Sequence, residues 1–425
     1  MLRRRARTAG ASAVLLAAAC LGLLPAPPSS AAAPAGASDI RQERWETDDI
    51  RQEQRWVLEA LNVEEAWRVT RGAGVTVALV DDGVDGEVAE LRGRVTVGPD
   101  LGRADPGETQ GGSGEEAATS RHGTAMASLI AGAGKGGGDG GLLGIAPEAR
   151  ILSLPLHFED EDGTIPPDAD LRTLRDSPLA RAIRYAADHG AQVVSMSLGA
   201  YGPHRAEREA VSYALSKGVV LVASAGNGGD SEYAVANATS FWNFPAGYPG
   251  VIGVGASDQV GEPAPFSSDN LSVLVSAPGV AVPVVLPGGR YGSSDGTSVS
   301  AALVAGVAAL IKAKYPDMSP QMVSRALATT TGFAPTAGYD DHIGFGVVDA
   351  GAALAKAGEL ASAASPPPVA EEHHFGTGPL PEEPPRPGAD PLRLWLYGAG
   401  LLLGVLAFAG AVVTLTRKSG SGGRL

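Results

Sequence analysis

The sequence predicts an α/β protein: a three-layer domain with a mainly parallel central sheet flanked by helices, followed by one C-terminal transmembrane helix. Short apolar, β-branched runs alternate with longer helical runs through the middle of the chain. These runs are apolar throughout, as in strands that are buried on both faces. One apolar stretch near the C-terminus is long enough to cross a bilayer. Alternation of strands with helices of this length is typical of a parallel sheet.

Five apolar runs are the predicted strands, at 75–80, 150–154, 193–196, 219–223 and 251–254. Helices are predicted over 178–189, 203–217, 303–314 and 320–329. Ser177-Pro178 and Ser319-Pro320 each place Ser at the N-cap and Pro at the first helical position, and Gly218 ends the second helix. Ligands of such sheets bind at the carboxyl ends of the strands, so we look there for functional residues.

Composition excludes some classes of protein. With 44% hydrophobic and 19% charged residues, the chain of 425 residues resembles a packed globular protein. Its net charge is −14 although the first ten residues carry four arginines and no acid, so we expect no nucleic-acid partner. The single cysteine, Cys20, lies in the N-terminal apolar segment, and we therefore expect a mature protein without disulfides.

Residues 1–33 have the layout of a signal peptide. Four arginines precede an apolar run over 11–24, and small residues and prolines follow up to Ala33. A permanent N-terminal anchor is one alternative, although the run is short for a span. Lipidation at Cys20 is another, although the alanines at 17–19 make a poor lipobox.

Residues 392–416 are predicted to form the transmembrane helix. They are apolar except for one arginine near the start, and Trp395 and Tyr397 lie where an aromatic belt would form. A basic pair follows at 417–418, which places the tail 417–425 in the cytoplasm and the body of the chain outside. We therefore expect a single-pass protein of the cell membrane. A buried core helix is the alternative.

Three segments are expected between the two ends: an N-terminal extension at 34–60, a folded domain at 61–359 and a Pro-rich linker at 360–391. The linker is rich in proline and glutamate, so it should behave as a semi-rigid spacer. Its histidines, His373 and His374, have no other metal-type residues nearby, and we expect them to be solvated.

Asp81 is the first candidate catalytic residue. It directly follows the strand 75–80 and precedes Asp82 and Gly83. An acid in this place can be held rigidly toward a partner, and the alternative is a turn acid that caps the next segment. Because side chains alternate along a strand, Asp81 and Asp82 should point to opposite sides, and only one can meet a histidine.

His122 and Ser298 each stand at the start of an expected helix of small residues. The Gly-Thr after His122 and the small residues beyond it favour a general base, with a structural histidine as the alternative. Ser298 follows Gly296, which permits a tight approach. The N-terminus of its helix offers unpaired N–H groups to a developing oxyanion, and an ordinary Ser N-cap is the alternative.

Asn227 is the fourth candidate. It follows the strand 219–223, where its side-chain amide can donate to a carbonyl oxygen that becomes negative. The alternative is a turn asparagine. Each of the four signals is weak alone, whereas the set is strong.

Together the four motifs resemble the subtilisin family of serine proteases (S8). They read VDDG at Asp81, HGTAMAS from His122, SAGNGG at Asn227 and GTSVSAALVAG at Ser298. The triad residues stand in the order that subtilisin uses, Asp, His, Ser. The resemblance covers about residues 63–354 and implies a subtilisin-like fold and serine endopeptidase activity.

By that resemblance, Ser298 would attack the scissile carbonyl and His122 would pass its proton to the leaving amine. Asp81 would orient and stabilise the imidazolium, while Asn227 and the N–H of Ser298 would form the oxyanion hole. Two further segments match the family's substrate-binding regions: Ser197, Leu198 and Gly199, and Ala223, Ser224, Ala225 and Gly226. No metal or cofactor is expected. Calcium binding is left open: the acidic run 159–162 could bind the ion, but its residues do not have the spacing of a calcium-binding motif.

The order of signal peptide, protease body, Pro-rich linker and membrane span resembles the mycosins, membrane-anchored subtilisins associated with type VII secretion in actinobacteria. The segments 142–147 and 244–249 also look like that group. The chain departs from it in lacking paired cysteines and in carrying Asp82 where threonine is usual. Partners implied are protein substrates, the membrane and a type VII secretion complex.

The extension 34–60 is short for an inhibitory propeptide. The motif Ile-Arg-Gln-Glu occurs in it twice, at 40–43 and 50–53, and this charged near-repeat could wrap the body. The loop 98–120, rich in Gly and Glu, could rim the cleft or be a solvated insertion.

The leading hypothesis is an endopeptidase that cleaves exported proteins, and two alternative functions remain open. The first is a structural subunit that stabilises a membrane secretion complex, with proteolysis secondary. The second is an esterase, because residues 292–296 match Gly-x-Ser-x-Gly and Asp341 and His342 lie downstream.

Overall fold

The computed structural model describes residues 39–43, 45–102, 120–135, 140–156, 177–362 and 391–419. The predicted signal peptide with Cys20, most of the predicted linker with its two histidines, most of the loop 98–120 and the acidic run 159–162 lie outside these residues. The chain divides into two compact units, Met1–Ala363 and Ala364–Leu425.

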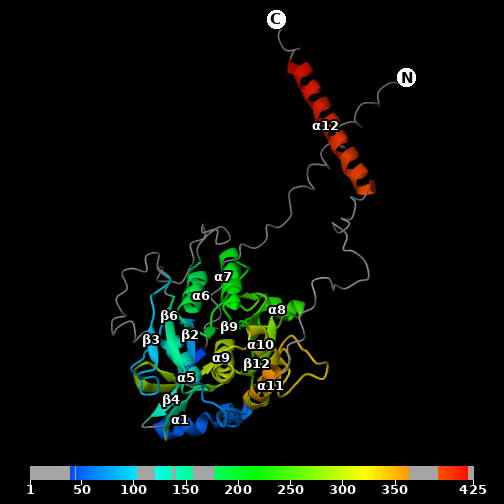
Figure 1. The fold of residues 1–425 in the computed structure, drawn as a ribbon. Helices are drawn as coiled ribbons and strands as arrows, with labels where there is room; N and C mark the ends of the chain where they lie inside the picture. Colours follow the sequence, from blue (N-terminus) through cyan, green and yellow to red (C-terminus); the bar gives the residue numbers. More distant parts are fainter. Residues whose placement is uncertain are drawn as a thin grey trace, which may run out of the picture. The chain divides into compact units, whose positions relative to one another are not determined.

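A seven-stranded parallel sheet organises the first unit (Figure 1). Its strands are β2 (Thr76–Asp81), β3 (Val95–Val97), β6 (Arg150–Pro155), β7 (Val193–Met196), β9 (Val220–Ser224), β11 (Val251–Ser257) and β12 (Val273–Pro278). They lie in the order β12-β11-β9-β7-β2-β6-β3, and every neighbouring pair is parallel. The α/β prediction is confirmed, and the five predicted runs are five of these strands.

Helices cover both faces of the sheet, as predicted. The helices that follow β3 in this unit are α5 (Arg121–Ala131), α6 (Pro178–Asp188), α7 (Arg205–Ser216), α8 (Glu232–Asn237), α9 (Thr297–Lys314), α10 (Pro320–Ala328) and α11 (Ala350–Ser362). The hydroxyl of Ser177 accepts the N–H of Ala180, and that of Ser319 accepts the N–H of Met322. The two Ser-Pro helix starts are therefore confirmed, with Ser as N-cap.

Alternation along β2 divides the core into two layers. Val77 and Leu79 belong to the layer that contains the side chains of α5 and α9, whereas Ala78 and Val80 belong to the layer of α6 and α7. Figure 1 shows α6 and α7 on the face of the sheet away from α5 and α9. Because α9 is buried nearly all round, it has to be apolar on every side.

The N-terminal segment is part of the folded body. It forms β1 (Asp39–Gln42), α1 (Thr47–Glu53), α2 (Arg55–Ala60) and α3 (Val63–Trp67). Strand β1 pairs antiparallel with β14 (Arg290–Asp295), which also pairs with β13 (Val282–Leu286), and the turn η2 (Pro287–Gly289) joins the last two. The sequence did not predict this second sheet, nor the small pairs β4 (Ala133–Lys135) with β5 (Gly140–Leu143) and β8 (Ala200–Tyr201) with β10 (Asn243–Phe244).

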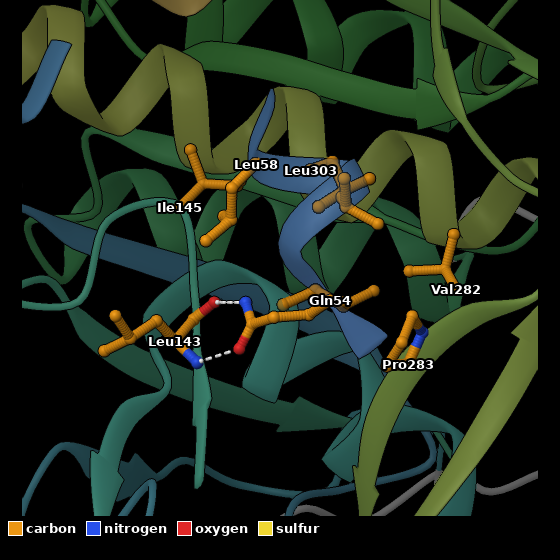
Figure 2. Close-up of a pocket in the computed structure, with 9 residues that line it drawn as sticks. Gln54, Leu58, Leu143, Ile145, Val282, Pro283 and Leu303 are labelled. Atoms are coloured by element: carbon orange, nitrogen blue, oxygen red, sulfur yellow. Dashed lines mark hydrogen bonds between the residues drawn. The ribbon is translucent and has the colours of Figure 1, made fainter. Parts of the chain in front are cut away.

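Gln54 holds this segment against the body (Figure 2). Its Nε2 donates to the carbonyl oxygen of Leu143 at 2.9 Å, and its Oε1 accepts the N–H of Leu143 at 2.8 Å. The side-chain amide thus satisfies both backbone groups of Leu143, as a neighbouring strand would. Gln54 is only 4% exposed, and Figure 2 shows it among Leu58, Ile145 and Leu303. The expected wrapping of the body by the extension is consistent with these contacts.

The second unit contains α12 (Pro391–Ser419), which corresponds to the predicted span 392–416. Among the described residues two helices are long and apolar enough to cross a membrane. In α9 the apolar segment Thr297–Lys314 has a mean hydropathy of 1.4 and is 89% buried. In α12 the apolar segment Trp395–Val413 has a mean hydropathy of 2.2 and no buried part. Helix α12 is therefore the candidate transmembrane helix.

Candidate active site

Three candidate residues follow neighbouring strands of the large sheet. Asp81 is the last residue of β2, Ser197 follows β7 directly and Asn227 comes three residues after β9. The order of strands reverses at β2, because β6 lies on one side of it while β7, β9 and β11 extend the sheet on the other. A crevice at the carboxyl ends of strands is expected at such a reversal, and the sequence candidates gather there.

His122 is the second residue of α5, and its ring meets the carboxylate of Asp81. His122 Nδ1 lies 2.7 Å from Asp81 Oδ1, with the side chain of Asp81 5% exposed and that of His122 23% exposed. Asp81 Oδ1 also accepts the N–H of Asp82 at 2.9 Å. Among the described residues, Asp81 Oδ2 has no hydrogen-bond partner, so the histidine is the main group that stabilises this buried charge.

Asp82 points to the backbone of α5 instead. Its Oδ2 accepts the N–H of His122 at 3.1 Å, and its Oδ1 accepts the N–H of Gly123 at 2.6 Å. Ser120, the N-cap residue, makes no side-chain capping bond to the helix, so the carboxylate of Asp82 takes that place. One acid thus contacts the ring of His122 and the other its backbone, so the prediction that the two side chains point to opposite sides is wrong. Asp82 lies in the bend after β2, where the alternation of a strand no longer applies.

Gly123 allows this close approach. A Cβ atom there would lie 2.0 Å from the carbonyl oxygen of Gly83 and 2.9 Å from Asp82 Oδ1. The turn after β2 could therefore not reach the start of α5 if residue 123 had a side chain. This gives a steric reason for the Gly that follows His122.

Burial and the two carboxylates determine the protonation of the site. Burial alone would lower the pKa of His122, but the charge and hydrogen bond of Asp81, together with the charge of Asp82, raise it to about 9. Burial, and then the charge of Asp81, raise the pKa of Asp82 to about 7, although the N–H groups of Gly123 and His122 favour its ionised form. The site therefore stabilises an imidazolium next to two acids.

Ser298 is the second residue of α9 and is 4% exposed. Asn227 Oδ1 accepts both the N–H and the hydroxyl of the preceding Thr297, at 3.0 and 2.9 Å. These two bonds to the amide oxygen fix the orientation of the Asn227 side chain. Ser197 Oγ donates to the carbonyl oxygen of Ser298 at 3.2 Å, and α9 packs against α5.

Both predicted substrate segments border one buried residue, Asn243, which the sequence did not reveal as a candidate. A Cβ on Gly199 would lie 2.6 Å from Asn243 Oδ1, and a Cβ on Gly226 would lie 2.6 Å from Asn243 Nδ2. Gly226 also donates its N–H to Thr297 Oγ1 at 3.2 Å, which ties the second segment to the start of α9. The only sequence signal for Asn243 is its place before the segment 244–249.

The esterase arrangement is not formed. In the Gly-x-Ser-x-Gly match, residues 292–295 lie inside strand β14 rather than in a turn between a strand and a helix. Asp341 and His342 do contact each other, at 3.1 Å, on the exposed surface. With Asp340 they form the one cluster of metal-type ligands among the described residues, and such exposed clusters are common without an ion.

A family model, sequence relatives and solved structures all indicate the same family for this chain. The family model for the subtilase family (peptidase S8) matches residues 72–346. Fervidolysin from Fervidobacterium pennivorans is 34% identical over 70% of this chain, which spans 43% of the length of fervidolysin. Subtilisin BL from Lederbergia lenta is 33% identical over 66% of this chain and 91% of its own length. The structure of MycP1 from the ESX-1 type VII secretion system is similar with a TM-score of 0.60 and 28% identity, over 77% of this chain and 91% of MycP1.

Proposed function

Because the chain belongs to the subtilase family of serine endopeptidases, we propose that Asp81, His122 and Ser298 are its catalytic triad and that it cleaves protein substrates through an acyl-enzyme. The observation that carries this proposal is the 2.7 Å contact between His122 Nδ1 and Asp81 Oδ1. That bond leaves Nε2 of the same ring to act as the base, which is the tautomer that the reaction needs.

In the first step the oxygen of Ser298 attacks the scissile carbonyl carbon, while His122 Nε2 takes the hydroxyl proton. Asp81 stabilises the imidazolium through Nδ1 and keeps its own negative charge. The carbon–nitrogen bond then breaks as the imidazolium gives its proton to the leaving amine. In the second half, His122 takes a proton from water, whose oxygen attacks the acyl carbon and releases Ser298.

The NH₂ group of Asn227 and the backbone N–H of Ser298 are the proposed oxyanion donors. The bonds from Thr297 to Asn227 Oδ1 support this role, because they hold the amide in one orientation. The start of α9 adds a positive partial charge near the same place. Donors held in advance of the reaction stabilise the transition state more than flexible ones do.

The two segments at 197–199 and 223–226 are the proposed substrate-binding regions. The first follows β7 and the second ends β9, so both border the carboxyl edge of the sheet. An extended substrate would pair with the backbone of the first, and the small residues of the second would surround the side chain before the cut. Asn243, which lies against Gly199 and Gly226, would hold the two regions at a constant separation.

We further propose that the protease is exported, anchored in the cell membrane by α12 and linked to type VII secretion. The apolar segment Trp395–Val413, which has no buried part, supports the anchor, and the basic pair 417–418 supports a cytoplasmic C-terminus. The similarity to MycP1 supports the secretion context. The substrates would then be exported proteins near the membrane.

A fluorophosphonate probe, which reacts only with an activated serine, tests the triad. The full chain in detergent should be labelled, and both Ser298→Ala and His122→Ala should abolish labelling. Ser300→Ala is a matched control on the same helix, because the hydroxyl of Ser300 only donates to the carbonyl oxygens of Ala277 and Pro278. This variant should label normally.

Absence of labelling in the folded wild-type chain would contradict the catalytic proposal and favour the structural subunit. The secretion context needs a separate test in cells. If proteolysis is the main role, a Ser298→Ala strain should lose processing of an exported protein. A secretion complex that needs the presence of the chain, but not its proteolytic activity, would remain intact in that strain.

A further inference from the structure

Asp82 is a partly buried acid that the proposed mechanism does not use. Its carboxylate accepts the N–H groups of His122 and Gly123, so it fixes the first turn of the helix that carries the general base. It comes from the turn after β2, next to the acid that holds the ring of the same histidine. His122 is therefore held at two points by two successive acids, through its ring and through its backbone.

We propose that Asp82 is a positioning residue for the general base, which fixes the backbone of His122 and, through its negative charge, makes hydrolysis work at more alkaline pH. The proposal rests on the catalytic role proposed for Asp81, His122 and Ser298. The carboxylate of Asp82 contacts the backbone of His122 and Gly123, and in the proposed mechanism it acts only through His122.

Two charged groups of the described residues face Asp82. They are Asp81, on β2, and His122, on α5. Near neutral pH the carboxyl of Asp82 loses its proton, since burial and Asp81 raise its pKa to about 7. Above this pH its charge helps to retain the proton on His122, whose pKa lies at about 9 because of Asp81 and Asp82 in spite of burial. Only the neutral imidazole can act as a base, so the acid limb of the activity profile should lie at high pH.

Asp85 offers a matched control in the same loop. Its Oδ1 accepts the N–H of Glu87 at 3.0 Å, and its Oδ2 accepts the N–H of Gly288 at 2.9 Å. It therefore binds two backbone N–H groups as Asp82 does, but they belong to other segments and Asp85 does not act on the pKa of His122. A general effect of removing an acid from this loop would appear in both variants.

The experiment measures the second-order rate of fluorophosphonate labelling of the full chain in detergent between pH 5 and pH 11. Asp82→Asn should move the midpoint of the acid limb down by about one unit or less, because an adjacent charge is lost. Asp82→Thr removes the same charge and should move it in the same direction. Asp85→Asn should follow the wild-type profile.

The pKa of the His122 ring is also measured by NMR titration, with the signal assigned by its loss in His122→Ala among the 7 histidines of the chain. This readout does not require activity, so it separates the inference from the proposed reaction. A lower pKa of His122 in Asp82→Asn supports the inference even if the chain hydrolyses nothing. An unchanged pKa in both Asp82 variants, or an equal shift in Asp85→Asn, would overturn it.

Discussion

The N-terminus of α5 and that of α9 both receive a polar side chain from a neighbouring loop, but only one of these side chains is charged. At α5 the carboxylate of Asp82 binds the N–H groups of His122 and Gly123. At α9 the amide oxygen of Asn227 binds the N–H of Thr297. A negative charge beside α5 favours a cation on His122. A neutral amide beside α9 leaves the positive end of that helix available to a developing oxyanion.

In the proposed reaction, the two helix ends would therefore serve opposite charges of the transition state. An imidazolium and an oxyanion form together when the serine attacks, and each needs its own environment. Interchanging the charges of the two loops should therefore be more damaging than removing either side chain.

The largest effect is expected at the acid that binds the histidine ring. Asp81→Asn should reduce kcat by about ten thousand-fold, because an amide favours the wrong tautomer of the ring and cannot stabilise its positive charge. Steady-state hydrolysis of a peptide substrate measures the loss. A decrease below about tenfold would contradict the catalytic role proposed for Asp81.

A second variant tests the neutral side chain at α9. Asn227→Ala should lower kcat by about 100- to 1,000-fold through the loss of one oxyanion donor. Asn227→Asp should lower it by roughly another tenfold, since a carboxylate repels the oxyanion and each 1.36 kcal/mol of barrier is tenfold in rate. Equal rates for the two variants would contradict the specialisation of this helix end.

The fold should require the glycines at the two helix starts for different reasons, one steric and one conformational. Gly123→Ala should destabilise the fold by about 3 kcal/mol through a clash with the carbonyl oxygen of Gly83. Gly296→Ala should cost about 1–3 kcal/mol, because φ is 147° at that residue and only glycine adopts it readily. Thermal unfolding measures both, with Gly190→Ala, at a positive φ in an uncrowded turn, as the control for conformational strain alone.

The smallest effect is a change in the pH dependence of stability. The pKa of Asp82 rises from its ordinary value of 3.8 to about 7 on folding, so its contribution lowers stability as pH rises through that window. The pKa of His122 rises from 6.5 to about 9, so its contribution is present below pH 6.5 and is lost as pH rises toward 9. Both groups thus destabilise the fold toward alkaline pH.

Asp82→Asn should consequently reduce the loss of melting temperature between pH 5 and pH 8, relative to the wild type. Asp85→Asn should keep the wild-type slope. The pKa of His122 should also fall when the charge of Asp82 is lost, which reduces the loss of stability toward alkaline pH further. Contributions of groups that do not interact with Asp82 are common to the compared chains and cancel in the difference. A slope that is equal or steeper in Asp82→Asn would mean that the carboxylate of Asp82 is already ionised at pH 5.

Much of the large domain could be predicted from local patterns. The strands β2, β6, β7, β9 and β11 stand out because a strand buried on both faces must be apolar at successive residues. The starts of α6 and α10 stand out because Ser supplies a capping hydroxyl and Pro stands at the first helical position, where an N–H group would have no partner within the helix. The second sheet escaped prediction, because β1 and β14 are far apart in sequence and short, and contain polar residues.

The amino-acid sequence alone specifies the chemical groups of the site, the strands that precede Asp81 and Asn227, and the presence of two long apolar helices. The folded structure brings Asp81 to the ring of His122, as the family resemblance implies, and it alone reveals that Asp82 binds the backbone of α5. It likewise decided that α9 lies in the core while the apolar surface of α12 stays exposed. Composition states which groups are available, whereas their partners and charges depend on distances between segments that are remote in the chain.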